Sequence, residues 1–249
     1  MTAESDLHSL PFIEKVYHFQ SIDSTNTFAK GLEHLPVRGL CIIAADRQTA
    51  GRGQRENLFF SDTDGGLYVS IVCPISDINA HFVYNQAISL SICQAIEDKV
   101  PIVQRGPIRI KWPNDIYWSD KKLCGFLLES LPRSPLRLVV GFGINVNITR
   151  EQFPLSIREH ATSIMIETGQ RFDCAALLCD ICRFFQEYLR LPGSEAHGLY
   201  RKRLYGMGRR IAVNGHSGLL RDVLEDGRLC IESNTMTAPI SSGTIQFID

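Results

Sequence analysis

The sequence predicts an α+β fold, in which a mixed sheet flanked by helices is followed by a small β-barrel. Three observations lead to this prediction. Several apolar strand-like runs follow one another with only short turns between them, which is typical of hairpins. Two long segments carry apolar residues at helical spacing, and the C-terminal part contains only short strand patterns. Because strands often follow strands directly, the order favours α+β over a strictly alternating β-α-β arrangement.

The N-terminal part of the sequence is expected to form strands and one short helix. The first strand is expected at residues 16–20, and a helix follows it, capped by Asp23 or Ser24. Residues 39–45 form a continuous apolar run, which indicates a strand buried on both faces. A further strand is expected at 66–73, where a proline follows it.

The central part of the sequence is expected to form a long helix and a group of neighbouring strands. Apolar residues at helical spacing indicate a helix over 80–100. A strand at 107–112 then enters a turn, and strands 115–118 and 122–129 flank a short polar stretch, which predicts a hairpin. The run at 136–144 predicts another strand, kinked by glycine.

The C-terminal part changes character. A second long amphipathic helix is expected at 172–191, and helical periodicity ends after residues 191–194 (LPGS) and more firmly after Tyr205. Short strands are expected at 209–213, 218–224, 228–232 and 243–248. Several short strands within so few residues are typical of a small barrel. We therefore divide the chain into a larger domain, residues 1–203, and a C-terminal barrel, residues 204–249.

Composition narrows the class of protein. The chain has 249 residues with 26 basic and 27 acidic side chains, a formal net charge of −1, and 44% hydrophobic residues. These values exclude wholesale disorder and argue against a sequence-blind nucleic-acid binder, which carries a basic excess. The sequence has neither a secretory signal nor a membrane-spanning run, so we expect a cytoplasmic protein with reduced thiols. Cys174, Cys179 and Cys182 lie on an expected helix and are assigned to the core.

A glycine- and arginine-rich segment, residues 48–55 (QTAGRGQR), is the strongest local signal. Glycines at 51 and 53 allow backbone N–H groups to approach an anion, and Arg52 and Arg55 add donors suited to phosphate or carboxylate. Taken alone, the segment fits an ordinary solvated loop equally well.

Two further segments carry charged residues at strand ends. Residues 111–115 (KWPND) place Lys111 and Asp115 around a proline turn, and an ordinary turn is the alternative. Lys122 opens the next strand and Gly125 lies inside it, although a charged hairpin tip is also compatible.

Two glycines also interrupt a predicted buried strand. Gly141 and Gly143 indicate the close approach of either a ligand or another backbone. Position 146 is valine, so the third glycine of a dinucleotide-binding fingerprint is missing.

Taken together and in this order, these segments resemble biotin protein ligases. The matching stretches are 23–26, 48–53, 67–70, 111–115, 121–129 and 141–147. The resemblance implies a class II synthetase-like catalytic domain followed by an SH3-like barrel. It also implies a two-step reaction, in which ATP activates biotin as biotinoyl-AMP and a lysine of a biotin carrier domain then accepts the biotinoyl group. The first match begins at residue 23, so we expect the enzyme-only form, without an N-terminal DNA-binding domain.

The resemblance also implies roles for individual residues. The biotin-binding set is Ser24, Thr25, Asn26, Gln48, Arg52, Gly53, Gln54, Lys122, Gly125 and Gly141. The ATP- and adenylate-binding set is Arg52, Arg55, Lys111, Asn114, Lys122, Leu127 and Asn145. Lys122, Arg52 and Asp115 are the expected catalytic residues. No direct metal ligand is expected, since Mg²⁺ would arrive with ATP, although Asp115 is a candidate to contact either the metal or the acceptor amine.

The chain departs from the family pattern at four positions. Gln54 stands where some members have arginine, Glu56 where glycine is usual, and Phe59 where tryptophan is usual. Thr244 replaces the usual glutamate of the last strand. These differences bear on affinity and loop order rather than on the type of reaction.

Two alternatives remain open beside the biotin ligase. A lipoate–protein ligase would use the same fold and adenylate chemistry, and a non-catalytic sensor would bind biotin or an adenylate without turnover. The expected partners are biotin, ATP with Mg²⁺, and a biotin carrier protein. Neither nucleic acid nor membrane is expected as a partner, and a homodimer is compatible with the sequence.

Overall fold

We describe a computed structural model of the chain for residues 7–34, 38–54, 58–101, 106–131, 135–233 and 237–248. A seven-stranded mixed sheet forms the larger part, in the order β1-β2-β3-β7-β6-β5-β4. Its strands are β1 (Ile13–Phe19), β2 (Leu40–Ala45), β3 (Gly66–Pro74), β4 (Ile108–Lys111), β5 (Asp115–Trp118), β6 (Lys121–Leu131) and β7 (Arg137–Asn145). The first two strands pair in parallel and all other neighbours pair antiparallel. The predicted mixed sheet is therefore confirmed.

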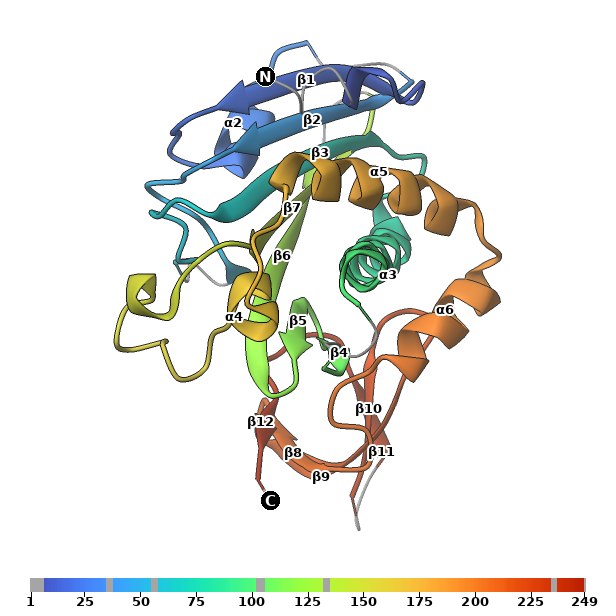
Figure 1. Cartoon of the computed structure of the whole chain (residues 1–249). Helices are drawn as coiled ribbons and strands as arrows, with labels where there is room; N and C mark the ends of the chain where they lie inside the picture. The colour runs from blue at the N-terminus through green and yellow to red at the C-terminus, as the bar shows by residue number, and fades with distance from the viewer. Residues whose placement is uncertain are drawn as a thin grey trace.

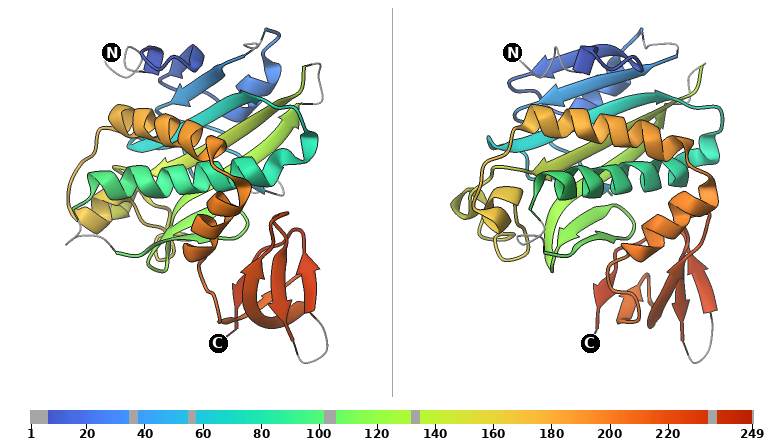
Figure 2. Two further views of the ribbon diagram at one scale, coloured as in Figure 1. Left: turned by 90° about the vertical axis from the view of Figure 1, so that its right-hand side faces the viewer. Right: turned by 45° about the vertical axis from the view of Figure 1, so that its right-hand side comes forward.

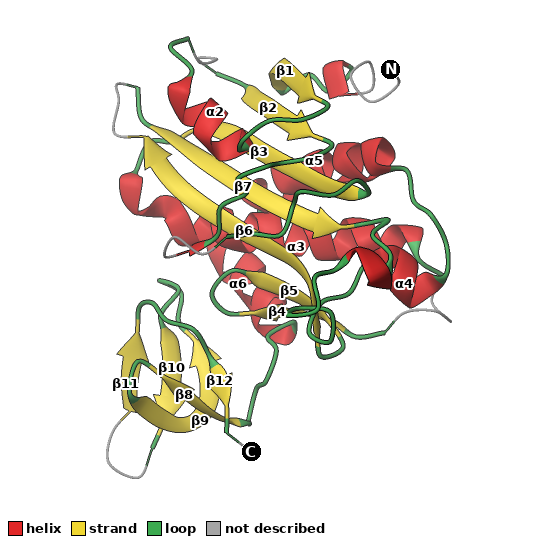
Figure 3. Cartoon of the chain, turned by 90° about the vertical axis from the view of Figure 1, so that its left-hand side faces the viewer, coloured by secondary structure: helices red, strands yellow, loops and turns green. Residues whose placement is uncertain are grey.

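The two long predicted helices cover one face of this sheet (Figure 1). They are α3 (His81–Lys99) and α5 (Cys174–Arg190), and their apolar side chains share one core with inward-facing residues of the strands. The short helix α2 (Thr25–Gly31) lies on the opposite face, which is otherwise crossed by loops (Figure 3). It packs Ala29 against Ile43 and Val139 in a second, smaller cluster. Because both faces of β2 are covered, all six of its residues are buried, as its continuous apolar run predicts.

Both candidate caps act at the start of α2. Ser24 is the N-cap residue, and its hydroxyl accepts a hydrogen bond from Thr27 N at 3.4 Å. The Asp23 carboxylate in turn accepts one from Ser24 N at 2.6 Å. These bonds satisfy amide groups that the first helical turn leaves without partners, and they fix the direction in which the helix leaves the sheet.

A five-stranded antiparallel sheet forms the C-terminal part, in the order β11-β10-β9-β8-β12 (Figure 2). Its strands are β8 (Arg210–Val213), β9 (His216–Val223), β10 (Leu229–Glu232), β11 (Thr237–Ile240) and β12 (Gln246–Phe247). The predicted fold class is thus confirmed: a large mixed sheet with helices, followed by a β-rich part. The division of the chain at residue 203 stays a prediction.

Several elements differ from the sequence prediction. Helical structure does not end at residue 191, because α6 (Gly193–Lys202) follows at once with Pro192 as its N-cap. Two elements were missed, α4 (Ile164–Thr168) and the strand β11, and β12 is shorter than expected. The single-turn 3-10 helices η2 (Ile78–Ala80) and η4 (Arg150–Gln152) were also missed. Helical periodicity was expected to weaken at Pro192 and Gly193, but proline is well tolerated where a helix begins.

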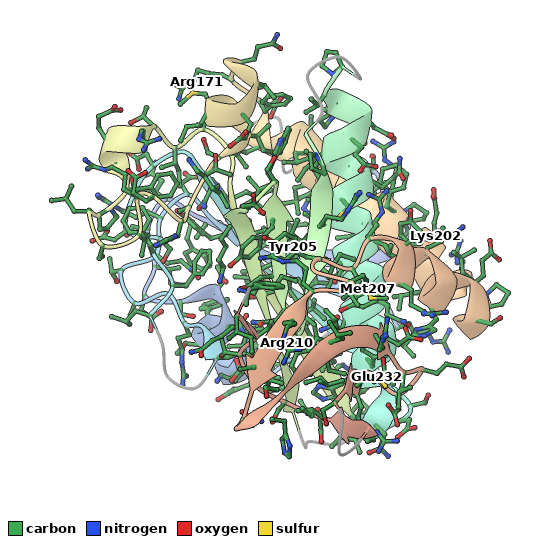
Figure 4. All side chains as sticks on the ribbon, turned by 90° about the horizontal axis from the view of Figure 1, so that it is seen from below. Arg171, Lys202, Tyr205, Met207, Arg210 and Glu232 are labelled. Carbon is green, nitrogen blue, oxygen red and sulfur yellow. The ribbon has the colours of Figure 1, made fainter. Side chains whose placement is uncertain are left out.

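The segment that connects the two sheets holds the C-terminal sheet against the β4 edge of the large sheet. Residues 203–205 run alongside β4, where Ile110 N donates to Arg203 O and Tyr205 N donates to Ile110 O, both at 2.8 Å. The Tyr205 ring stacks on Tyr117 and meets Phe247 edge-on. Figure 4 shows Tyr205 where the chain enters the C-terminal strands. The two sheets are therefore joined by backbone and aromatic contacts.

The assignment of the helical cysteines to the core is consistent with the structure. Cys179 and Cys182 are buried, Cys174 is half-buried against the same core, and the eight cysteines are free thiols. In the part of the chain that is described, no group of three or more His, Cys, Asp or Glu residues is arranged to hold a metal ion. Among the same residues, no helix is long and apolar enough to cross a membrane.

An ion pair between helices provides a test of this packing. Arg203 binds Glu97 of α3 through both terminal nitrogens, at 2.6 and 2.7 Å, and each side chain is only 21% exposed. Glu97→Ala leaves the guanidinium half-buried without its carboxylate, so we expect a loss of roughly 2 kcal/mol in the free energy of unfolding, measured in urea.

The exposed pair between Arg150 and Glu159 is the control for that measurement. The Glu159 side chain is 69% exposed, so Glu159→Ala should leave the urea midpoint unchanged. Equal effects of the two substitutions would contradict the role given to the Arg203–Glu97 pair.

Candidate active site

A cavity of about 220 Å³ opens on the α2 face of the large sheet and reaches the C-terminal part. Most of the predicted site residues line it. They are Ser24, Thr25, Asn26, Gln48, Arg52, Gly53, Gln54, Lys111, Asn114, Asp115, Lys122, Gly125, Leu127 and Gly141. These residues come from separate parts of the sequence, so the fold brings the matched motifs together.

Two predicted residues stand apart from this set. Asn145 is buried and is not among the lining residues, and its amide donates to Thr162 O at 2.9 Å. Arg55 lies outside the described residues, as does Glu56. The predicted ligand contacts of Asn145 and Arg55 therefore remain predictions.

One end of the cavity is polar and neutral. Four polar residues are buried there: Ser24, Thr25, Asn26 and Gln48. Gln48 Oε1 accepts a hydrogen bond from Thr25 N at 2.8 Å and lies 3.0 Å from Thr25 Oγ1. The start of α2 is thereby tied to the strand-to-loop segment that carries Gln48. This end therefore offers neutral amide and hydroxyl groups in fixed positions.

The loop after Gln48 folds back on itself. Gln48 N donates to Ser61 O, and Phe59 N donates to Gly51 O, both at 2.9 Å. A side chain at position 51 would lie 2.1 Å from Ser61 Oγ, so glycine is required for this close return. Arg52 and Leu58 form an isolated antiparallel bridge, which holds Arg52 at the cavity wall.

The other end of the cavity is cationic. Lys122 Nζ lies 2.7 Å from Asp115 Oδ1, and these side chains are 36% and 20% exposed. Strand pairing places Asp115 opposite both Lys111 and Gly125. Asp115 is the only carboxylate among the described residues that line the cavity, while Arg52, Lys111 and Lys122 all carry positive charge. The end therefore has an excess of positive charge.

Lys111 is held among aromatic rings. Its Nζ lies 3.2 Å from Tyr117 Oη, 4.9 Å from the centre of that ring and 5.7 Å from the centre of Phe247. Burial lowers the pKa of the Lys111 ammonium, and the negative charge of Asp115 opposes this change.

A strip of glycines joins the two ends of the cavity. A side chain at Gly141 would lie 2.0 Å from Asn26 Oδ1, and one at Gly143 would lie 2.4 Å from the Phe59 ring. The sequence left a ligand and another backbone as equal explanations for these glycines. In the structure, the groups packed against them are the side chains of Asn26 and Phe59.

Asn114 supports the edge of β6. Its Nδ2 donates to Phe126 O at 2.8 Å, and Phe126 N donates to Asn114 O at 2.9 Å. The turn that contains Asn114 begins with a cis peptide bond between Trp112 and Pro113. Asn114 thus continues the pairing with β6 on the N-terminal side of β5, which begins at Asp115.

Sequence reasoning missed several residues at the cavity. Gly243, Thr244 and Ile245 of the C-terminal part line it, although only Thr244 was singled out and no site role was assigned there. Ser70 and Glu129, which contact the polar end from behind, were also missed. A serine inside an otherwise apolar strand run was an available signal for Ser70, which the structure buries completely.

Comparisons with known proteins agree with this arrangement. The model of the biotin/lipoate A/B protein ligase family matches residues 18–147. The bifunctional ligase/repressor BirA of Bacillus subtilis is 28% identical over 244 residues, covering 93% of this chain and 73% of that protein. The biotin–[acetyl-CoA-carboxylase] ligase of Mycobacterium tuberculosis is 27% identical over 238 residues, covering 89% and 85%.

A solved structure shows the same architecture. The biotin protein ligase from Aquifex aeolicus in complex with biotin and ATP superposes with a TM-score of 0.79 at 26% identity, covering 94% of this chain and 98% of that one. The chain therefore belongs to the biotin/lipoate A/B protein ligase family, which confirms the resemblance to biotin protein ligases that its sequence motifs indicate.

Proposed function

We propose that this chain is an ATP-dependent biotin protein ligase that forms biotinoyl-AMP and transfers the biotinoyl group to a lysine of a carrier domain, such as that of a carboxylase. One observation carries the proposal: a single cavity joins a neutral hydrogen-bonding end to a cationic end across a strip of glycines. Biotin has a polar ureido ring, an apolar body and a carboxylate, in the matching order. The names of the relatives support biotin as the substrate.

The neutral end suits the ureido ring. This ring offers a carbonyl oxygen and two N–H groups, and it carries no charge. Ser24, Thr25 and Gln48 supply hydroxyl and amide groups that both donate and accept. A dithiolane ring, as in lipoate, has no groups that could use the remaining donors and acceptors of these side chains, and each buried hydrogen bond left unmade costs about 1–3 kcal/mol. The polar end therefore favours biotin over lipoate.

The cationic end suits the first chemical step. A carboxylate oxygen of biotin attacks the α-phosphorus of ATP, a new P–O bond forms, and pyrophosphate leaves. Both reactants are anions, and two unit charges 4 Å apart repel by about 4 kcal/mol at an effective dielectric constant of 20. Arg52 and Lys122 would bracket the carboxylate and α-phosphate and offset this repulsion, while Lys111 would bind the outer phosphates.

The donor set fits a magnesium ion that arrives with the nucleotide. Asp115 offers one carboxylate beside the cationic end, and one or two carboxylates plus substrate phosphates are the usual ligands of Mg²⁺. Bound there, the ion would screen the charge of the phosphates. Asp115 is paired with Lys122 at 2.7 Å, so contact with a metal would require that pair to loosen.

The second step needs a neutral amine. The carrier lysine nitrogen attacks the acyl carbon of biotinoyl-AMP, the bond to AMP breaks, and the amine loses a proton. A free lysine has a pKa near 10.4 and is mostly protonated at neutral pH. Asp115 is the carboxylate that would orient this amine or accept its proton.

Exchange of labelled pyrophosphate into ATP tests the first step. With magnesium present, we expect exchange that depends on biotin and does not occur with lipoate. Exchange with lipoate alone would assign the chain to the lipoate ligases of the same family. Tight biotin binding without exchange would identify a sensor.

We expect Lys122→Ala to reduce biotin-dependent exchange by roughly 10²–10³-fold, the usual effect of removing a group that stabilises transition-state charge. The neighbouring Lys121→Ala is the matched control, since Lys121 is not among the residues lining the cavity. Equal losses in the two variants would contradict the role of Lys122.

Asp115→Ala separates the two steps. We expect transfer to the carrier lysine to fall at least tenfold further than adenylate formation, measured in single-turnover assays that start from biotin or from preformed biotinoyl-AMP. If both steps fall equally, Asp115 acts by holding Lys122 rather than on the amine.

A further inference from the structure

A chain of hydrogen bonds runs behind the polar end of the cavity and ends at a charged group. Glu129 of β6 accepts from Lys30 Nζ and from Asn26 Nδ2, each at 2.8 Å. Asn26 Oδ1 lies 2.5 Å from Ser70 Oγ, which lies 2.8 Å from Thr25 Oγ1. Thr25 contacts Gln48 in turn. Residues from α2, β3 and β6 are thus linked to the loop that follows β2.

The charge of Glu129 determines which group donates at each step of this hydrogen-bond chain. An ionised carboxylate only accepts, so the amide of Asn26 must turn its nitrogen to Glu129 and its oxygen to Ser70. An amide oxygen cannot donate, so the single Ser70 proton is committed to Asn26. Only the Thr25 proton is then left for the contacts of Thr25 with Ser70 and Gln48.

The surroundings of Glu129 keep it ionised. Burial alone would raise the pKa of its carboxyl group, but hydrogen bonds from Lys30 and Asn26 outweigh burial and hold the pKa below its ordinary value. The positive charge of Arg52 acts in the same direction.

Asn26 connects this chain to the cavity wall. Its amide packs against Gly141, where a side chain on the glycine would meet Asn26 Oδ1 at 2.0 Å. Ser70, with an exposed fraction of 0%, has no access to water that could replace its partners. A reversed amide at Asn26 would therefore release the Ser70 proton toward Thr25 and change the group to which the Thr25 hydroxyl donates at the cavity.

We propose that Glu129 is a positioning residue for biotin: its charge fixes the Asn26 amide and, through Ser70, orients the Thr25 hydroxyl that meets the ureido ring. Glu129 itself does not line the cavity. The inference rests on the proposed function, because it assigns the polar end to biotin. The simpler alternative is that Glu129 and Lys30 only tie α2 to the sheet.

Glu129→Gln tests the direction of the hydrogen-bond chain. Lys30 would attract the new amide oxygen and turn its nitrogen toward Asn26, which would favour a flipped Asn26 and a reversed chain. We expect the Kd for biotin to rise about tenfold, measured by titration calorimetry, while the KM for ATP in pyrophosphate exchange stays within about twofold of wild type.

A second substitution in the same protein provides the rescue. In Glu129→Gln with Lys30→Met, the amide oxygen is free to face Asn26, so the original direction returns. We expect biotin affinity to recover to within about threefold of wild type, although the tie between α2 and the sheet is now weaker. A purely structural role predicts further loss in the double variant.

Ser70→Ala keeps the test decisive if Glu129→Gln folds poorly. It removes the link between Asn26 and Thr25 and leaves the Glu129–Lys30 pair in place, so biotin affinity should fall while the KM for ATP stays within about twofold of wild type. An unchanged biotin Kd in Ser70→Ala or Glu129→Gln overturns the inference. So does parallel loss for ATP, or the absence of rescue. Wild-type protein without biotin-dependent exchange would instead overturn the proposed function.

Discussion

The site depends on one constraint, the burial of a single face of the large sheet beneath α3 and α5. This burial fixes the register of the strands, since a shift by one residue would turn the apolar side chains outward. With register fixed, β4, β5 and β6 place Lys111, Asp115 and Gly125 side by side at the cavity. The opposite face is covered only in part by α2, so the same strands are free to line an open pocket there.

Space on that open face comes from three glycines, which have no side chain to fill it. Gly125, Gly141 and Gly143 lie next to one another across β6 and β7, because Gly125 pairs with Gly143 and Leu127 with Gly141. Glycine weakens a strand interior, so a cluster of three is explained by what must lie against it. Asn26 and Phe59 occupy that position. For a ligand to lie along the strip, the Phe59 ring must move aside or cover it.

Much of this was available from the sequence, and the rest depended on contacts between distant residues. Continuous apolar runs and helical spacing predicted β2, β3, β7, α3 and α5, because burial imposes those patterns directly. Pro192 and Gly193 concealed α6, since the same residues suit a linker or a helix start. Glu129 resembles any charged strand residue until the register of β6 places it behind Asn26. Local patterns therefore located the glycines and cations of the site, but not Ser70 and Glu129, which hydrogen-bond to Thr25 and Asn26 from behind.

The C-terminal sheet is part of the site rather than an appendage. Gly243, Thr244 and Ile245 contribute to the cavity wall, and Trp112 Nε1 donates to Gly227 O at 2.9 Å across the junction. Phe247 lies between two cations, with its ring centre 4.1 Å from the Arg209 guanidinium and 5.7 Å from Lys111 Nζ. An ammonium group near the faces of aromatic rings is attracted to them, which restrains its position. The last strand thus restrains a cation of the large sheet, so the position of the C-terminal sheet and the cationic end of the cavity are coupled.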